Sequence, residues 1–196
     1  MHSELYAFLL STGVIFVAEL GDKSQLMAMT FATRYRARDV LVGITVATAL
    51  VHLASVGIGH LVGSSFADYQ GTIEVVAGIA FLGFAAWTLR GDELTTEEAA
   101  KAKQATGMAL LAVGTAFFLA ELGDKTMLAT ITLATQEGWF GTWIGSTLGM
   151  VAADALAIGV GALLGRNLPE HVIKWFASAL FALFGFLLIA QGAGWL

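Results

Sequence analysis

The sequence contains no cysteine, a single proline and few charged residues. The absence of cysteine excludes disulfides, thiolate metal sites and cysteine nucleophiles, so any bound metal must be held by oxygen, imidazole or thioether groups. Charged residues make up only 13% of the chain against 57% hydrophobic residues, and the mean hydropathy is +0.77. This balance exceeds what a water-exposed surface tolerates. The 23 glycines indicate closely packed helices, and we expect an all-α membrane protein.

Positive charge is scarce as well, and its placement predicts the orientation. The net charge of -5 argues against a nucleic-acid partner. The first apolar run lacks a basic leader and a small-residue cleavage site, so we expect it to stay in the mature protein. Positive residues are retained on the cytoplasmic side of a membrane. Eight of the ten Lys and Arg residues lie in or beside the first, third and fifth connections. We therefore expect a multi-pass protein of the cell inner membrane with both termini periplasmic.

Six runs are long and apolar enough to cross about 30 Å of hydrocarbon as helices of roughly 20 residues. They cover residues 5–33, 39–63, 71–90, 107–135, 141–165 and 171–190. A charged stretch separates the third run from the fourth. The sequence thus predicts a first three-helix unit over 1–90, a charged cytoplasmic linker over 91–106 and a second three-helix unit over 107–196.

The two units carry the same motif. Glu-Leu-Gly-Asp-Lys-Ser, starting at Glu19 (the first motif), recurs as Glu-Leu-Gly-Asp-Lys-Thr, starting at Glu121 (the second motif), 102 residues later. The same offset pairs Gly43 with Gly145. Because each unit has an odd number of spans, the second copy must enter the membrane from the opposite side. We therefore expect two inverted three-helix repeats, the architecture of many secondary transporters, with the substrate site between them.

Each motif places two carboxylates one helical turn apart near the middle of a span: Glu19 with Asp22, and Glu121 with Asp124. A lone carboxylate at that depth costs roughly 2.5 to 3.5 kcal/mol on insertion scales, so the four acids require partners. If the two faces meet, they form a set of hard oxygen donors suited to Mg²⁺, Ca²⁺ or Mn²⁺. The four acids are therefore the predicted metal ligands.

Neighbouring polar residues extend this prediction. Ser24, Gln25 and Thr126 could add oxygen donors, and Lys23 and Lys125 balance the charge, which leaves the ionised cluster at about minus two. One divalent ion or two protons would neutralise it, so we expect exchange of a cation for protons. The alternative is that each motif forms only a local Glu to Lys ion pair that stabilises a buried helix.

Other polar positions within the spans remain open to two interpretations. His52 and Asp154 also differ by 102 residues, and each is either an additional metal ligand or proton relay, or part of a hydrogen-bonded interhelical pair. Gly21 and Gly123 lower helix propensity by about 1 kcal/mol relative to alanine, so each could permit a kink or an unwound turn.

The duplicated motif resembles that of the membrane cation exchangers with two E-x-G-D-[KR]-[ST] signatures. This family includes bacterial manganese exporters of the MneA type and Golgi calcium/manganese–proton exchangers. The resemblance covers nearly the whole chain. It implies that Glu19, Asp22, Glu121 and Asp124 bind the transported ion and that the protein is a transporter, with Mn²⁺ efflux across a bacterial inner membrane as the favoured function.

Competing functions remain at this stage. A Ca²⁺/H⁺ antiporter is the first alternative, followed by a transporter of another substrate such as a basic amino acid. An intramembrane metal-dependent hydrolase is disfavoured because neither a nucleophile nor a three-ligand His/Glu arrangement is evident. A purely structural bundle would not explain the buried acids. No ATP-binding loop is present, so we expect an ion gradient to drive transport and no cofactor to be needed. A homodimer is compatible with the sequence.

Overall fold

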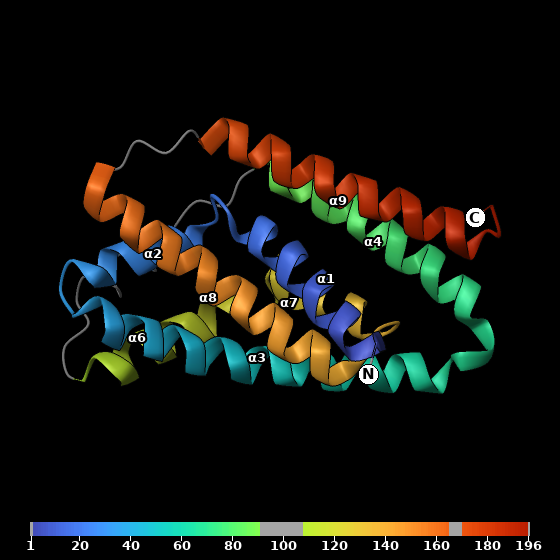
Figure 1. The fold of residues 1–196 in the computed structure, drawn as a ribbon, viewed down its shortest axis with the longest axis horizontal. Coiled ribbons are helices and arrows are strands. Elements are labelled where there is room, and N and C mark those ends of the chain that lie inside the picture. The colour runs from blue at the N-terminus through green and yellow to red at the C-terminus, as the bar shows by residue number, and fades with distance from the viewer. Residues whose placement is uncertain (1, 91–107, 165–169, 196) are drawn as a thin grey trace.

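The computed structural model describes residues 2–90, 108–164 and 170–195. The expected linker over 91–106 lies outside the described residues. Every regular element within the described ranges is helical (Figure 1). The elements are α1 His2–Glu19, α2 Lys23–Ala32, α3 Ala37–Ser65, the short 3₁₀ helix η1 Ala67–Tyr69, α4 Gln70–Arg90, α6 Ala109–Glu121, α7 Lys125–Ala134, α8 Trp139–Leu164 and α9 Glu170–Gly192.

Two of the six expected spans are interrupted at the motifs. Instead of one helix over 5–33, the chain forms α1 and α2, which are bent by 78°. Instead of one helix over 107–135, it forms α6 and α7. The glycines explain both breaks, because Gly21 has a φ of 75° and Gly123 a φ of 79°, a left-handed conformation that disfavours residues with a Cβ atom. The interruption expected at these glycines is confirmed.

The other four expected spans are single helices, α3, α4, α8 and α9, whose ends lie within a few residues of the expected boundaries. Among the described residues, four helices are long and apolar enough to cross a membrane, or five if the bent pair of α1 and α2 is one span. The apolar helix α6 has only 13 residues, and a helix of that length is too short to span the hydrocarbon layer alone. The expectation of an all-α membrane protein is confirmed.

Glycines bring helices of the two units into close contact. On α8 a glycine at every fourth position faces the backbone of α1, and the pairs are Gly141 with Glu4, Gly145 with Phe8 and Gly149 with Thr12. Since both members of these pairs ascend together, α1 and α8 run in the same direction. On the other side, Gly43 of α3 packs against Val113 of α6, and Gly59 packs against Ile131 of α7. Such small-residue contacts let helix backbones approach within a bilayer.

Helices α4 and α9 form an antiparallel pair at one side of the molecule (Figure 1). Gly71 lies against Gly192 and Gly78 lies against Gly185. The Ser178 hydroxyl donates a hydrogen bond to the Ala85 carbonyl at 2.9 Å, and phenylalanine rings from both helices form a cluster in which the rings contact one another. Its members are Phe81, Phe84, Phe181 and Phe184.

The distribution of side chains is the reverse of that in a water-soluble protein. Large apolar side chains such as Leu9, Leu61 and Phe186 are exposed by 60% or more. Carboxylates of both motifs, by contrast, are buried. Exposed hydrocarbon around a polar interior fits a bundle that is surrounded by lipid, where backbone polar groups are satisfied within the helices.

Candidate cation site

The helix breaks place the motif acids at helix ends. Glu19 is the last residue of α1 and Glu121 the last of α6, whereas Asp22 and Asp124 are the N-cap residues of α2 and α7. The N-terminus of a helix carries partial positive charge. Both aspartates therefore lie where the field of a short helix stabilises a carboxylate, in addition to any neighbouring cation.

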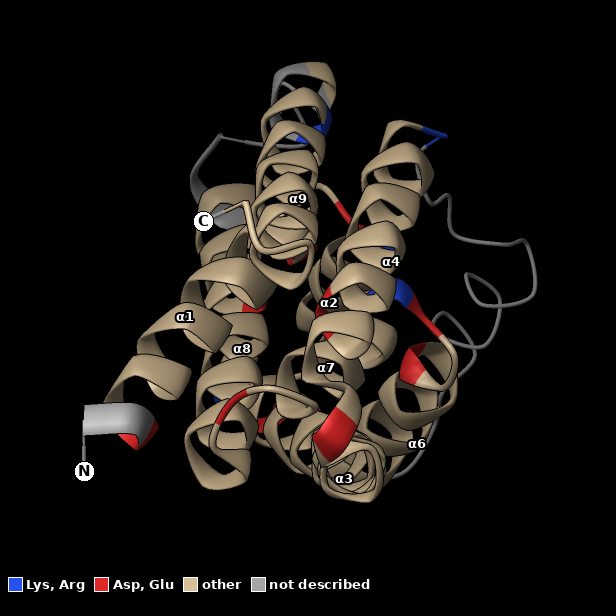
Figure 2. Ribbon diagram, turned by 90° about the vertical axis from the view of Figure 1, so that its right-hand side faces the viewer, with Lys and Arg blue, Asp and Glu red and all other residues tan. Residues whose placement is uncertain are grey.

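The structure brings the two acid pairs together. All four side chains are buried, with at most 4% of any of them exposed. Glu19 interacts electrostatically with Asp22 and with Glu121, and Glu121 interacts with Asp22 and Asp124. Figure 2 shows acidic segments enclosed among the helices near α2 and α7. The sequence alone predicted this meeting of the motifs, and the arrangement concentrates negative charge at one place inside the bundle.

A hydroxyl from the same motif holds each glutamate. The Ser24 hydroxyl donates to Oε1 of Glu19, and the Thr126 hydroxyl donates to Oε2 of Glu121 at 2.9 Å. Within the described part of the chain, Oε2 of Glu19 and Oε1 of Glu121 have no hydrogen-bond partner. Each glutamate thus has one oxygen fixed by a hydroxyl and one oxygen available for another ligand.

Lys125 joins the two motifs. Its ammonium group donates to Oδ1 of Asp22, which lies 103 residues away in the other unit. The Lys125 side chain is only 3% exposed, whereas Lys23, at the equivalent position of the first motif, is half-buried. The contact of Lys125 with Asp22 therefore differs from the local Glu to Lys pair of the structural alternative, because it links the two units.

Gln25 fastens the first motif to a neighbouring helix. Its Oε1 accepts a hydrogen bond from the Gly21 N–H at 2.8 Å, and its Nε2 donates to the Ala153 carbonyl of α8 at 2.9 Å. The side chain is 3% exposed. The amide oxygen, which we expected as a donor to the ion, is engaged by the backbone of the unwound turn.

Asp154 belongs to the acid cluster, and His52 lies at the equivalent position of α3. Asp154 interacts electrostatically with Glu19, Asp22 and Glu121, and neither of its oxygens has a hydrogen-bond partner among the described residues. His52 is also fully buried with both ring nitrogens lacking such a partner. The roles of these two residues therefore stay predictions.

The acids are close together, but they do not converge as ligands in this conformation. Over residues 2–90, 108–164 and 170–195, no three His, Asp or Glu side chains have an arrangement that could hold a metal ion. In this conformation the Lys125 ammonium group lies on Asp22, and a hydroxyl engages one oxygen of each glutamate. Complete coordination would require these side chains to rearrange, and the ligand set stays a prediction.

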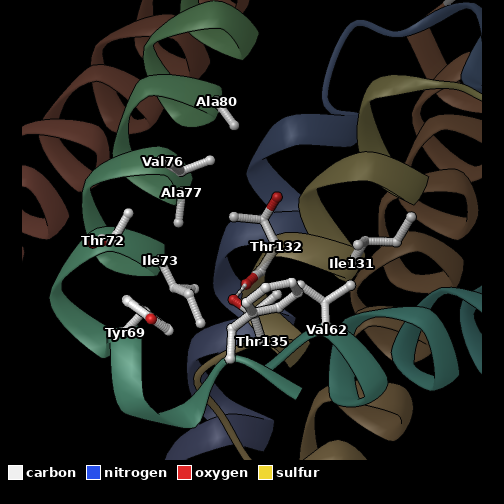
Figure 3. A pocket seen from close by; sticks show the side chains of 11 residues that line it. Val62, Tyr69, Thr72, Ile73, Val76, Ala77, Ala80, Ile131, Thr132 and Thr135 are labelled. Atoms are coloured by element: carbon white, nitrogen blue, oxygen red, sulfur yellow. Dashed lines mark hydrogen bonds between the residues drawn. The ribbon is translucent and has the colours of Figure 1, made fainter. Parts of the chain in front are cut away.

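An apolar cavity of about 540 Å³ lies between α3, α4 and α7 (Figure 3). Its walls include Val62, Ile73, Val76 and Ile131, and the polar groups facing it include the hydroxyl of Thr132. No motif acid lines it. A cavity with such walls does not replace the hydration shell of a cation, so the candidate site is the acid cluster.

Sequence reasoning missed a partly buried contact of Glu4. Oε2 of Glu4 accepts a hydrogen bond from the Gly141 N–H at 2.6 Å, close to the N-terminus of α8. A carboxylate stabilises the positive end of a helix, so Glu4 fastens the start of α1 to the start of α8. An acid near the beginning of an apolar run was the available signal, but its partner, 137 residues away, could not be read from the sequence.

Comparison with known proteins identifies the family. The family described as "Divalent cation/proton antiporter GDT1" matches residues 7–96 and 109–195, which covers both units and both motifs. The chain belongs to the GDT1 family. The resemblance drawn from the motifs is thereby confirmed, and GDT1 membership makes the protein a multi-pass membrane transporter rather than an enzyme.

Individual GDT1 relatives match most of this chain. A Vibrio cholerae protein named as a candidate manganese exporter is 34% identical over 179 residues, which cover 89% of this chain and 86% of that protein. The GDT1-like protein sll0615 of Synechocystis is 30% identical over 92% of this chain and 95% of its own. The chloroplastic GDT1-like protein 2 of rice is 33% identical over 87% of this chain and 57% of its own. No solved structure gives a significant match.

Proposed function

We propose that this protein exports Mn²⁺ across the bacterial inner membrane in exchange for protons, with Glu19, Asp22, Glu121 and Asp124 as the ligands of the transported ion. One observation carries the proposal: the four acids, duplicated 102 residues apart, are buried together where two broken helices end. Membership of a divalent cation/proton antiporter family and the relative in Vibrio cholerae support the reaction and the metal.

Charge explains how exchange works in this site. Four ionised acids with two lysines carry a net charge of about minus two, and a buried charge of that size is unfavourable in a medium of low dielectric constant. A divalent ion neutralises it, and so do two protons. Because both bind the same carboxylates, binding of one favours release of the other. Asp154 adds a fifth acid, either as a ligand or as a proton relay, and His52 is a relay candidate at the equivalent position.

We propose that the two units are inverted repeats. Helices α2 (Lys23–Ala32) and α7 (Lys125–Ala134) coincide after the shift of 102 residues, and so do the first residues of α3 and α8. Thr48 of α3 donates a hydrogen bond to the sulfur of Met150, its own equivalent on α8, at 3.3 Å. Equivalent residues meet in this way on a twofold axis. The same axis would map the parallel pair of α1 and α8 onto the parallel pair of α6 and α3.

In this arrangement the chain crosses the membrane six times. The pairs α1 with α2 and α6 with α7 each form one broken span, both termini face the periplasm, and the unwound turns lie near the midplane. The two units, 1–90 and 107–196, would rock against each other and expose the acids alternately to the two sides. Such discontinuous helices are suited to bind ions, because their ends present partial charges and backbone groups.

The proposal is tested by uptake into everted membrane vesicles that contain the full-length protein. Mn²⁺, Ca²⁺ and Mg²⁺ are compared with and without an imposed proton gradient. We expect Mn²⁺ uptake that depends on the gradient, and we expect Asp22→Asn and Asp124→Asn each to abolish it. Preferential Ca²⁺ uptake would reassign the protein as a Ca²⁺/H⁺ antiporter, and uptake indifferent to the gradient would refute the coupling.

A matched control separates the loss of a ligand from the loss of fold. Asp39 lies in the first turn of α3, is exposed by more than a third and pairs with Arg38 at 3.3 Å. Asp39→Asn removes the same charge at a position outside the acid cluster, and its uptake should equal that of the unmodified protein. Membrane insertion of all variants is checked by their abundance in purified vesicles.

A further inference from the structure

Lys125 is the one lysine buried within the described part of the chain. It is the first residue of α7 in the second unit, yet its ammonium group lies on Asp22 of the first unit. Charge balance alone does not require this crossing, because Glu121 and Asp124 are close to Lys125 in sequence. The position of Lys125 therefore raises the question of what it does at Asp22.

An ammonium group and a divalent ion cannot both occupy the same side of Asp22. A metal ion requires a carboxylate oxygen at about 2.0 to 2.5 Å, and two cations that close together repel strongly where the surroundings are not water. Binding of the ion at Asp22 must therefore move the ammonium group. Lysine is suited to such movement, because its charge is carried on a flexible four-carbon stem.

The reverse step follows from the same charges. When the ion leaves Asp22, the carboxylate would be buried without a cation, which is strongly unfavourable. Return of Lys125 provides a cation within the protein and offsets that cost. The two units are then also held together by the ion pair, so the change in occupancy at Asp22 is linked to the contact between the units.

We propose that Lys125 is a tethered counter-cation that exchanges with the transported divalent ion at Asp22, and so sets both the affinity for the ion and the rate of its release. Lys125 is in this sense a positioning residue and not a ligand. The inference rests on the proposed function, because it takes Asp22 to be a ligand of the transported ion.

The first test uses purified full-length protein, with Mn²⁺ binding measured by titration calorimetry and transport measured in proteoliposomes. Lys125→Met keeps the length of the side chain and removes the charge. We expect the Kd for Mn²⁺ to fall about tenfold and the maximal transport rate to fall, because release of the ion is no longer assisted. Lys125→Arg retains the charge and should restore most of both values.

Lys23→Met is the matched control at the equivalent, half-buried position, and it should shift the Kd less than Lys125→Met does. A Kd that is unchanged or raised in a folded Lys125→Met protein would overturn the exchange. Absence of Mn²⁺ binding to the unmodified protein would instead refute the proposed function, so the two failures are distinguishable.

A second measurement needs no variant. Acylation of Lys125 by a membrane-permeant reagent is followed by mass spectrometry in the unmodified protein, with and without saturating Mn²⁺. Displacement from Asp22 should increase the modification of Lys125 when Mn²⁺ is present. An unchanged or decreased modification, under conditions where Mn²⁺ binding is measurable, would contradict the proposal.

Discussion

The unwound turns of the two motifs have the same backbone conformation, but different side chains accept the hydrogen bond from the glycine of each turn. In the first turn the Gly21 N–H donates to the amide oxygen of Gln25 at 2.8 Å. In the second the Gly123 N–H donates to the sulfur of Met127, the residue equivalent to Gln25, at 3.2 Å. A thioether is a weak acceptor. The first turn is thus held more firmly than the second, although both present the same acids.

The two motifs also differ in how deeply their lysines are buried, and here the second motif has the more buried side chain. The second motif contributes a fully buried lysine that reaches the first, whereas Lys23 is only half-buried. The two motifs have therefore kept the same acids while the residues around them have diverged. The comparison teaches that the first motif has the more firmly held turn, and that the second motif supplies the buried lysine that joins the two motifs.

The largest difference in the effect of equivalent substitutions on transport is expected at positions 52 and 154. Asp154→Asn should reduce Mn²⁺ transport by about 100-fold, because it removes a carboxylate that interacts with three of the motif acids. His52→Asn should reduce transport by less than about threefold, since it removes no carboxylate. Initial rates in proteoliposomes measure both. Equal losses in the two variants would contradict the asymmetry.

The next effect is on the stability of the first turn. Gln25→Met should lower the free energy of unfolding by about 1 to 3 kcal/mol, because the Gly21 N–H loses a good acceptor and the Ala153 carbonyl loses its donor. Denaturation of the detergent-solubilised protein measures this. The matched exchange in the second turn, Met127→Gln, provides Gly123 with a stronger acceptor and should leave stability unchanged or slightly increased. A Met127→Gln protein as unstable as Gln25→Met would refute the interpretation.

A smaller change is expected from the backbone of the second turn. A Cβ atom at Gly123 would meet nothing within 4 Å, so Gly123→Ala should destabilise by about 1 to 2 kcal/mol through its positive φ alone. Gly83 in α4 also has open space around it, and Gly83→Ala should be neutral or stabilising because alanine favours a helix. The Tm of each variant, measured by thermal unfolding, distinguishes the two substitutions. Destabilisation by both would contradict the assignment of the effect to the positive φ of Gly123.

The smallest effect concerns pH at the connection after α7. Partial burial raises the pKa of Glu137 above its ordinary value, whereas the equivalent residue of the first unit is Tyr35. A carboxyl group whose pKa is raised in the folded state favours folding at low pH, and this contribution is lost as the pH rises through the raised pKa. Glu137→Gln should remove that slope and shift Tm by less than about 2 °C. An unaltered slope of Tm against pH from 4 to 7 would exclude Glu137 as its source.

The sequence predicted much of the fold because membrane spans are encoded locally. Long apolar runs set α3, α4, α8 and α9 to within a few residues, and the glycine of each motif marked the breaks. The repeat also predicted that the motif acids would meet. These are properties of composition, periodicity and internal symmetry, which one sequence displays directly.

Contacts across the chain could not be predicted in the same way. The lysines at 23 and 125 occupy equivalent positions of the two motifs, yet Lys125 is buried on an acid of the other unit, whereas Lys23 is half-buried. His52 and Asp154 are equivalent by offset, but that equivalence did not reveal the interaction of Asp154 with the motif acids. Such differences depend on how the helices of two imperfectly symmetric units pack, which the local sequence does not specify.

The hydrogen bond from Gln25 to the carbonyl of Ala153 has a mechanical consequence. Ala153 directly precedes Asp154, so the start of α2 in the first unit is coupled to the backbone of α8 in the second unit next to its buried acid. When the units move against each other, Asp154 would travel with the first motif rather than with the helix break of its own unit. Asp154 would then move together with the first unit, and its distance from Glu121 would lengthen and shorten in each transport cycle.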